Sequence, residues 1–518
     1  MRKVLVLTVS LLCCALAMAQ RVQSTFTSQE IETAFQQFLA TDNAAGMGLF
    51  QPSSGSKTQI EGLYKAGDDH LTQVGTPEYG FDFSTLRYDR FTDYLFMRGT
   101  FHYNYSKEKE RKWSDVIDPW FSIPFIYGNS VAKDYDKHNC GLSFDLYTAP
   151  LSGWISVGLR AKYEVADISG LRDPRPRTGY LNWQVVPSVL FSIGRHHIGL
   201  DFGYGYSKEK LSGLTTIQSY PNLYYYKMFG LDRVDGSIGG FTGFKRQFYG
   251  GRFMGELSYN YVGQNFRALV SAGIEYSKLE AYGDKKQAPG AYDAFLYHAM
   301  ASFLLQSGSL LHRWELKGSI KDAGAHEFLQ ELISVKDPVT SIISENWVTV
   351  YEYRNRYMLG QQQASLDYTL YGACDGKDYR WSVVAGANYS AFKKESFLPY
   401  SEFSVKTVGF TLGGWWRLMD VARHKLELGV NAAGSLPIKV TQGLMTENDY
   451  TREVLVPDAA YYRKQRVGGD ATLTWIFPLN LGKAGAANGY LRLGGDYRKA
   501  IGGGQLWGAT VTVGLFTF

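Results

Sequence analysis

The last thirteen residues, 506–518, constrain the fold more than any other stretch of the chain. They read LWGATVTVGLFTF, and large apolar residues alternate with small or polar ones along most of the run. A β-strand produces this alternation when its two faces meet different surroundings. A strand that ends a chain on an aromatic residue leaves an edge that another strand has to cover. The C-terminus therefore predicts the closing strand of a sheet.

The first nineteen residues have the order of a secretory signal peptide. Arg2 and Lys3 precede an apolar run over 4–16, and the triplet Ala17–Ala19 is small at both ends, as a cleavage site requires. We expect cleavage after Ala19, which gives a mature chain that begins at Gln20.

The mature chain alternates in the same way as its C-terminus. Segments with a period of two include 155–165, 197–206, 256–261, 313–320, 425–431 and 491–498. Many alternating segments run for roughly a dozen residues or more, whereas globular strands peak near ~5 to 6 and a tilted membrane strand needs about 9 to 11. After residue 19, no uninterrupted apolar stretch reaches the roughly 18 residues of a membrane helix. A chain of this kind crosses a membrane only as a barrel.

The composition and both termini together resemble those of Gram-negative outer-membrane β-barrels. The 37 Tyr, 30 Phe, 11 Trp and 56 Gly supply aromatic girdles and strand bends. The resemblance covers nearly the whole mature chain. It implies the outer membrane as location, contact with its lipid, and recognition of the terminal strand by the barrel-assembly machinery through Phe518. More narrowly, the chain is similar to a group of such barrels known only as a domain of unknown function.

One irregularity distinguishes the terminal strand from that family pattern. Phe516 and Phe518 are in phase with Thr512, not with the apolar Val513. The sequence leaves two explanations open, a bulge that restores the phase or a lipid-facing Thr517.

Connection lengths predict the number of strands. Short connections are expected at 149–153, 193–195, 262–265, 307–309, 374–377 and 420–423, and long loops at 107–136, 209–250, 324–351 and 436–463. Barrels of this class place short turns at one end and long loops at the other. We expect an all-β antiparallel barrel of 18 strands over 58–518, with 16 or 20 as alternatives.

Two of the long loops have their own patterns. The aromatic residues in 209–250 indicate that this loop folds inward or contacts a partner. In 324–351, apolar residues at helical spacing over 326–335 predict a short lid helix, followed by one long strand near 352–373.

The segment 20–57 precedes the barrel and is expected to form a plug. A capping box at Thr27–Glu30 predicts an amphipathic helix over 28–40, and its apolar residues, including Phe35 and Phe38, need a partner such as the lumen. The next stretch, Asn43–Gly46, resembles weakly the Asn-Pro-Ala element near the plug of fatty-acid-transporter-type barrels, without its proline. A plain turn is the alternative.

Charged residues on the polar faces of the strands are candidates for the lumen wall. The basic and acidic members could set up a field across a pore, or they could simply pair with one another, and we favour pairing. They are Arg160, Lys162, Glu164, Asp201, Glu256, Arg313, Glu315, Lys317, Arg492, Asp496 and Arg498.

The sequence gives little indication of nucleic-acid binding, metal binding or catalysis. The formal charge of +5 falls to +3 without Arg2 and Lys3, too little to predict nucleic-acid binding. The nine histidines show no metal-ligand spacing, and the sequence holds no nucleophile elbow or phosphate-binding loop. We expect no cofactor, no metal and no enzyme. Cys140 and Cys374 are placed at opposite ends of the barrel, too far apart for a disulfide.

These patterns favour a channel or transporter for small solutes whose lumen is restricted by the plug and the long loops. A transporter of hydrophobic molecules and a surface barrel that binds a cell-envelope partner are the alternatives. A TonB-dependent transporter is disfavoured, because that family has a plug of well over a hundred residues before its barrel.

Overall fold

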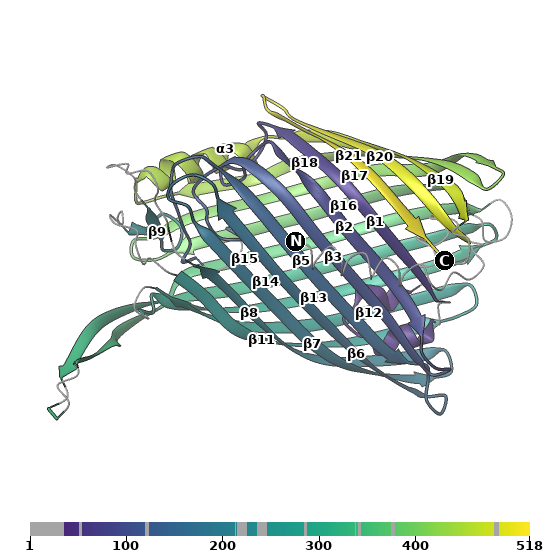
Figure 1. Ribbon diagram of the computed structural model, residues 1–518, viewed down its shortest axis with the longest axis horizontal. Helices are drawn as coiled ribbons and strands as arrows, with labels where there is room; N and C mark the ends of the chain where they lie inside the picture. The colour runs from purple at the N-terminus through teal and green to yellow at the C-terminus, as the bar shows by residue number, and fades with distance from the viewer. Residues whose placement is uncertain are drawn as a thin grey trace.

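The computed structural model shows a closed antiparallel β-barrel (Figure 1). It describes residues 36–50, 54–119, 124–212, 214, 225–235, 246–283, 287–336, 338–339, 343–373, 379–480 and 486–517. Over these residues, eighteen strands pair in one sheet, and β1 closes it by pairing with β21. The expected fold and the expected count of 18 are confirmed.

The barrel strands follow one another around the wall in chain order. They are β1 (Gly55–Gly67), β2 (Glu78–Arg90), β3 (Leu95–Arg111), β5 (Lys133–Thr148), β6 (Ile155–Gly170), β7 (Arg177–Ile193), β8 (His196–Leu211), β11 (Arg246–Val262), β12 (Phe266–Tyr282), β13 (Gly290–Ser307), β14 (Leu310–Lys336), β15 (Ile343–Ala373), β16 (Tyr379–Ser396), β17 (Ser401–Val421), β18 (His424–Gly443), β19 (Arg466–Asn480), β20 (Ala486–Ala500) and β21 (Gln505–Phe516).

Short and long connections separate the two ends of the barrel. The end where β1 begins and β21 finishes carries tight connections such as 194–195, 308–309 and 422–423, and we call it the turn end. The opposite end, the loop end, carries the longer connections 112–132 and 444–465. These five connections coincide with or overlap the predicted ones.

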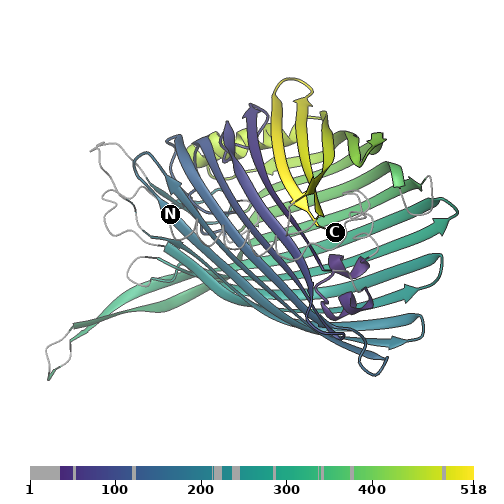
Figure 2. The ribbon, with the colours of Figure 1, turned by 45° about the vertical axis from the view of Figure 1, so that its right-hand side comes forward.

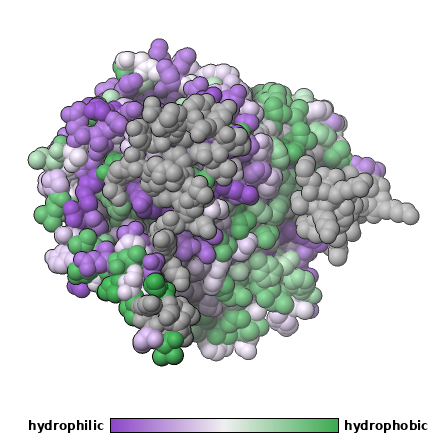
Figure 3. All heavy atoms as spheres, turned by 60° about the vertical axis from the view of Figure 1, so that its left-hand side comes forward, coloured by the Kyte–Doolittle hydropathy of each residue, from purple (hydrophilic) through white to green (hydrophobic). Residues whose placement is uncertain are grey.

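The two faces of the wall differ as the alternation requires. Side chains such as Ile60, Phe202 and Val513 lie on the outer face and are about half exposed, whereas Thr512 beside Val513 is buried. Figure 3 shows hydrophobic side chains gathered over one side of the molecule and mainly hydrophilic ones around the end that faces the viewer. An apolar outer face around a polar interior is the arrangement of an outer-membrane β-barrel.

The terminal strand keeps a regular register to its end. Phe516 is fully buried with Ile476 and Tyr490, and β21 pairs with both neighbours without a bulge. Thr517 is 4% exposed and its hydroxyl lies 2.9 Å from the Ser56 amide that donates to it. Both explanations offered for the phase are therefore wrong for Phe516, and Phe518 lies outside the described residues. Phe516 simply points inward.

Loops fold into the barrel at the loop end. The connection between β8 and β11 contributes β9 (Tyr226–Met228) and β10 (Val234–Asp235), which form a small sheet with β4 (Tyr127–Gly128). The connection between β18 and β19 contributes the π-helical turn η4 (Thr451–Leu455) and the helix α3 (Val456–Arg463).

These loops and the wall share one buried apolar cluster, which we call the loop cluster. Its members include Trp113, Phe125, Tyr127, Tyr225, Met228, Leu231, Tyr292, Tyr357, Phe392, Phe403, Tyr450 and Leu455. The aromatic loop therefore folds inward in its described part, which was one of its two predicted arrangements. The loop cluster narrows the lumen at this end.

The predicted lid helix at 326–335 is wrong, and so is the predicted loop at 324–351. The strand β14 continues to residue 336 and β15 begins at 343, and the two pair along this whole length. The wall strand β13 pairs with β14 only as far as Glu327, and β16 pairs with β15 only as far as Tyr357. The part beyond, 328–336 and 343–356, forms a two-stranded ribbon that we call the arm; it projects from the barrel in Figures 1 and 2.

Candidate functional site: the plug and the lumen cavity

The described part of the N-terminal segment, 36–50, lies inside the barrel near the turn end, and we call it the plug (Figure 2). It consists of two short 3₁₀ turns, η1 (Gln37–Ala40) and η2 (Ala45–Leu49). The helix expected over 28–40 is described only in its last residues, which form η1, and Phe35 lies outside the described residues. Phe38 is buried against wall residues that include Tyr147 and Leu190.

Asn43 organises the bend between the two turns. Its Oδ1 accepts a hydrogen bond from the Gly46 amide at 3.0 Å, and its Nδ2 donates to the Val189 carbonyl at 3.4 Å. Asn43 is fully buried. An Asn side chain that bonds a nearby backbone amide stabilises a turn, so the Asn43–Gly46 element is a turn that also contacts the wall.

The plug docks on the wall through polar contacts as well as through the apolar cluster around Phe38. Gln37 donates to the Ser302 carbonyl at 2.8 Å and accepts from the Asn260 amide group at 3.1 Å. The Ala45 amide donates to the Ser188 hydroxyl at 3.0 Å. Water can replace these hydrogen bonds when the plug leaves the wall, but it does not replace the apolar contacts of Phe38 and Met47.

Glycine allows the plug to approach the wall closely. A Cβ added to Gly158 of β6 would lie 2.3 Å from the Ala45 nitrogen, and one added to Gly48 would lie 2.0 Å from the Thr148 carbonyl oxygen. Both atoms are backbone atoms and cannot rotate away. Glycine inside a strand often marks such a close approach, and Gly158 therefore belongs to the docking surface.

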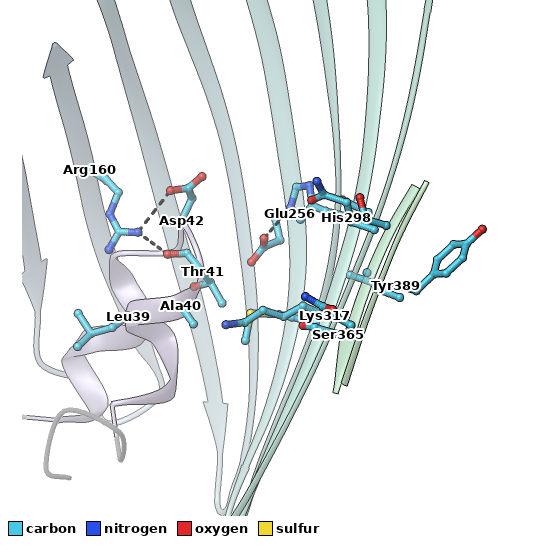
Figure 4. A pocket seen from close by; sticks show the side chains of 18 of the residues that line it. Leu39, Ala40, Thr41, Asp42, Arg160, Glu256, His298, Lys317, Ser365 and Tyr389 are labelled. Atoms are coloured by element: carbon cyan, nitrogen blue, oxygen red, sulfur yellow. Dashed lines mark hydrogen bonds and ion pairs between the residues drawn. The ribbon is translucent and has the colours of Figure 1, made fainter. Parts of the chain in front are cut away.

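A cavity of about 840 Å³ lies between the plug and the wall (Figure 4). The plug supplies its Leu39–Asp42 side, and β6, β11, β13, β14, β15 and β16 supply the rest. Tyr389 points away from the cavity in Figure 4. The polar side chains that line it are Thr41, Asp42, Arg160, Lys162, Glu256, His298, Lys317, Ser319, Gln363, Ser365, Asn388 and Ser390.

Asp42 joins the plug to two cations of β6, and we call this contact the ion latch. Lys162 Nζ lies 2.8 Å and Arg160 Nη1 3.4 Å from Asp42 Oδ1. Arg160 also donates to the Thr41 carbonyl. Burial raises the pKa of the Asp42 carboxyl, but the charges of Lys162 and Arg160 outweigh burial and hold the pKa below its ordinary value. The docked plug therefore favours the ionised carboxylate.

Strand register holds Arg160 in place. Arg98, Asp145 and Arg160 stand directly opposite one another on β3, β5 and β6. Asp145 is fully buried and accepts from Arg160 Nε at 2.6 Å and from Arg98 Nη1 at 3.1 Å. Charge-assisted bonds of this kind are about twice as strong as neutral ones. The bond to Asp145 therefore holds Arg160 in place independently of the plug.

A second row across the wall combines acids and a histidine. Asp201 stands directly opposite Glu256, and both are buried. Glu256 lies 3.0 Å from His298, which reaches it across Gly273. A Cβ on Gly273 would lie 2.5 Å from the His298 ring nitrogen. Glycine at this position is what lets the His298 ring reach Glu256.

Neutral polar groups continue this row on the far side of the cavity. His298, Ser319, Gln363 and Ser390 are paired in turn on β13 to β16. The adjacent row carries Lys317, Ser365 and Asn388. The cavity thus has a charged side near the plug, and opposite it a side of hydroxyl and amide groups that includes one cation, Lys317.

The structure brings together only some of the predicted lumen residues. Arg160, Lys162, Glu256 and Lys317 line the cavity, and Asp201 lies beside it. The others make separate contacts: Glu164 with Asn139, Arg313 with Glu315, Arg492 with Thr474, Asp496 beside Gly508, and Arg498 with Asp69. Two of these contacts, Arg313 with Glu315 and Arg498 with Asp69, are ion pairs of the kind that the sequence interpretation favoured.

Sequence reasoning missed Asp42, Asp145 and His298. A signal was present for His298, because it shares the inward phase of β13 with Ser302. Asp42 immediately precedes the predicted plug residue Asn43, but its two partners lie 118 and 120 residues away. Such pairs depend on where the plug docks.

Three further observations bear on the site. The described residues contain no group of three or more His, Cys, Asp and Glu side chains suited to a metal ion. None of the helices in the described ranges is long and apolar enough to cross a membrane. Cys140 is a free thiol on β5, and Cys374 lies outside the described residues.

The chain matches the model of a family of unknown function, DUF6850, over residues 44–517. It belongs to that family. This match confirms the similarity to a barrel group of unknown function that the sequence predicted. It spans the second half of the plug and all eighteen strands of the barrel. No curated protein sequence matches the chain.

Solved structures with a similar fold are distant in sequence. The FrpB iron transporter from Neisseria meningitidis is 9% identical, with 92% of this chain and 83% of that chain covered and a TM-score of 0.39. The ferric yersiniabactin uptake receptor FyuA from Yersinia pestis is 10% identical, with 90% and 80% covered and a TM-score of 0.34. The ferric citrate transporter FecA is 8% identical, with 89% and 78% covered and a TM-score of 0.40. Nothing in these comparisons bears on the fatty-acid-transporter resemblance of Asn43–Gly46.

Proposed function

We propose that the chain is an outer-membrane transporter for small polar solutes, whose lumen is gated by the plug. The observation that carries the proposal is the docking of the plug through polar contacts directly beside a charged cavity. The signal sequence and the apolar outer wall support the outer membrane as its location.

A gated path fits the arrangement better than a permanently open pore. The plug restricts the lumen near the turn end, and the loop cluster restricts it at the loop end. The cavity lies on the lumen side of the plug and has a polar lining, which favours a polar solute over the hydrophobic cargo of the alternative hypothesis.

Single-channel conductance in planar bilayers tests this proposal. The mature chain and a variant that lacks 20–51 are refolded in parallel, and heat-modifiable electrophoretic mobility verifies that both barrels are folded. We expect steady conductance only from the deletion variant. Equal conductance from both would show an open pore without a gate, and folded barrels that never conduct would refute transport.

The arm supports a second candidate function, the binding of a cell-envelope partner. Its apolar side chains are about half exposed, including Leu329 at 51%, Val335 at 55% and Val350 at 54%. A two-stranded ribbon on its own is marginally stable in water, and exposed strand edges invite pairing. We propose that the arm docks on such a partner at the loop end.

Site-specific photocrosslinking in cells tests the second candidate. A photoreactive residue at Val348 in the arm is compared with one at Ile60, an outward-facing position on β1. A discrete protein adduct from position 348 alone supports partner binding. Adducts from both positions or from neither would refute it.

A further inference from the structure

Asp42 occupies a carboxylate-binding position on the lumen wall. We propose that this position takes a small dicarboxylate solute, which displaces Asp42 and releases the plug. The inference rests on the proposed function, because it names the class of solute and the trigger for the same gate.

The binding groups remain in place when Asp42 leaves. Arg160 is 5% exposed and is bonded to the fully buried Asp145, so its guanidinium stays fixed without the plug. Lys162 is 45% exposed, and Asp42 itself is 36% exposed, beside the cavity. A solute in the cavity can therefore reach the ammonium group while the plug is still docked. Preorganised groups of this kind bind with little loss of side-chain freedom.

Replacing the Asp42 carboxylate by one carboxylate of the solute leaves the charge beside Arg160 and Lys162 unchanged. The docked plug places one carboxylate against Arg160 and Lys162. If that carboxylate departs, Arg160 keeps Asp145 as its acidic partner and the site becomes more positive by one charge. An incoming carboxylate restores the original balance and can use the charge-assisted bonds that Asp42 made.

A third cation, Lys317, supplies a contact for the second carboxylate of the solute that Asp42 does not make. Asp42 is tethered, and a tethered group competes with a local concentration on the order of millimolar. A solute must therefore add a contact that Asp42 lacks. Lys317 lines the same cavity and its side chain is 54% exposed. Its Nζ lies 3.8 Å from Glu315 Oε1, which is a long distance for an ion pair. Gln363 and Asn388 add amide groups beside it.

Hydrogen exchange of the plug tests the proposal on the full refolded chain in detergent. Exchange of 36–50 is followed by mass spectrometry in increasing succinate, with its neutral diamide, succinamide, and with sodium chloride at equal ionic strength as comparisons. We expect succinate alone to raise plug exchange, in a saturable way and by about tenfold, the effect of losing one charge-assisted hydrogen bond.

Four variants separate the roles of the residues. Asp42→Asn should exchange quickly without succinate and stop responding to it, and Lys162→Gln should lose the response. Lys317→Gln, which leaves the latch intact, should need about tenfold more succinate, as expected for one lost charged contact. Asp89→Asn removes a carboxylate that pairs with Arg87 on the wall and should behave like the unmodified chain.

A response equal to that of succinamide or chloride would overturn the proposal, as would fast exchange in Asp42→Asn while the unmodified chain ignores succinate. Failure of transport is distinguishable from failure of the carboxylate site. Conductance after plug deletion without a succinate response removes only the solute assignment. A succinate response in a barrel that never conducts removes transport and leaves the carboxylate site.

Discussion

Replacing Asp145 by Asn tests the row of charges that supports the ion latch. Asp145 is fully buried and bonds two guanidinium groups, at 2.6 Å and 3.1 Å. Asparagine keeps the shape but removes the charge, which leaves Arg160 buried with only the half-exposed Asp42 as an acidic partner. Breaking a buried ion pair in this way costs about 3 to 5 kcal/mol. Because Arg98 is 21% exposed and Arg160 retains Asp42, we expect a loss near the lower limit, ~3 kcal/mol.

Urea unfolding of the refolded barrel in detergent micelles, followed by tryptophan fluorescence, measures this loss. Asp89→Asn is the matched control, because Asp89 pairs with a partly exposed Arg87 and should cost at most about 1 kcal/mol. Asp145→Asn should also increase hydrogen exchange of the plug, since Arg160 is then no longer fixed. A loss as small as that of the control, with plug exchange unchanged, would refute the role assigned to this row.

Three further outcomes follow from the structure. Asp201→Asn should stabilise the barrel by up to about 1 kcal/mol in the same urea assay, because it removes one of two carboxylates that stand directly opposite each other; destabilisation would contradict this. The pKa of Asp42 is lowered in the docked plug, so the docking energy is present above the ordinary Asp value of 3.8 and is lost as the pH falls through the lowered pKa. Plug exchange, normalised for its intrinsic pH dependence, should rise over that acid range and should rise less in Asp42→Asn; identical profiles would count against the ion latch. Replacing 330–350 by Asn-Gly, between the paired Leu329 and Tyr351, should leave the unfolding midpoint unchanged, because the wall strands do not extend that far; a large drop in the midpoint would show that the arm supports the barrel.

The architecture was predictable from the sequence because the features that define a barrel are local sequence patterns. A period of two assigns the two faces of each strand, and connection lengths assign the two ends. The prediction failed at 324–351, where Phe328, Leu332 and Ile333 have helical spacing. The spacing of apolar residues in a short run does not distinguish a helix from a strand. Here the strand conformation depends on pairing with a later segment, in which Trp347 lies opposite Leu332.

The candidate site was predictable only in part, because it depends on register. Lys162, Glu256 and Lys317 were recognisable as inward-facing residues. Their grouping around one cavity requires the exact pairing of many strands, and a slip of one residue turns a side chain to the other face. The ion latch further requires the docked position of the plug, which places Asp42 beside Lys162.

Conductance of Gly158→Val in planar bilayers shows whether the docked plug closes the lumen. A side chain at position 158 collides with the backbone of the plug at Ala45, whereas Gly179 on β7 has open space and Gly179→Val is the matched control. We expect that Gly158→Val conducts steadily while the unmodified chain and Gly179→Val stay closed. A folded Gly158→Val barrel that remains closed, or an unmodified chain that conducts equally well, would contradict it.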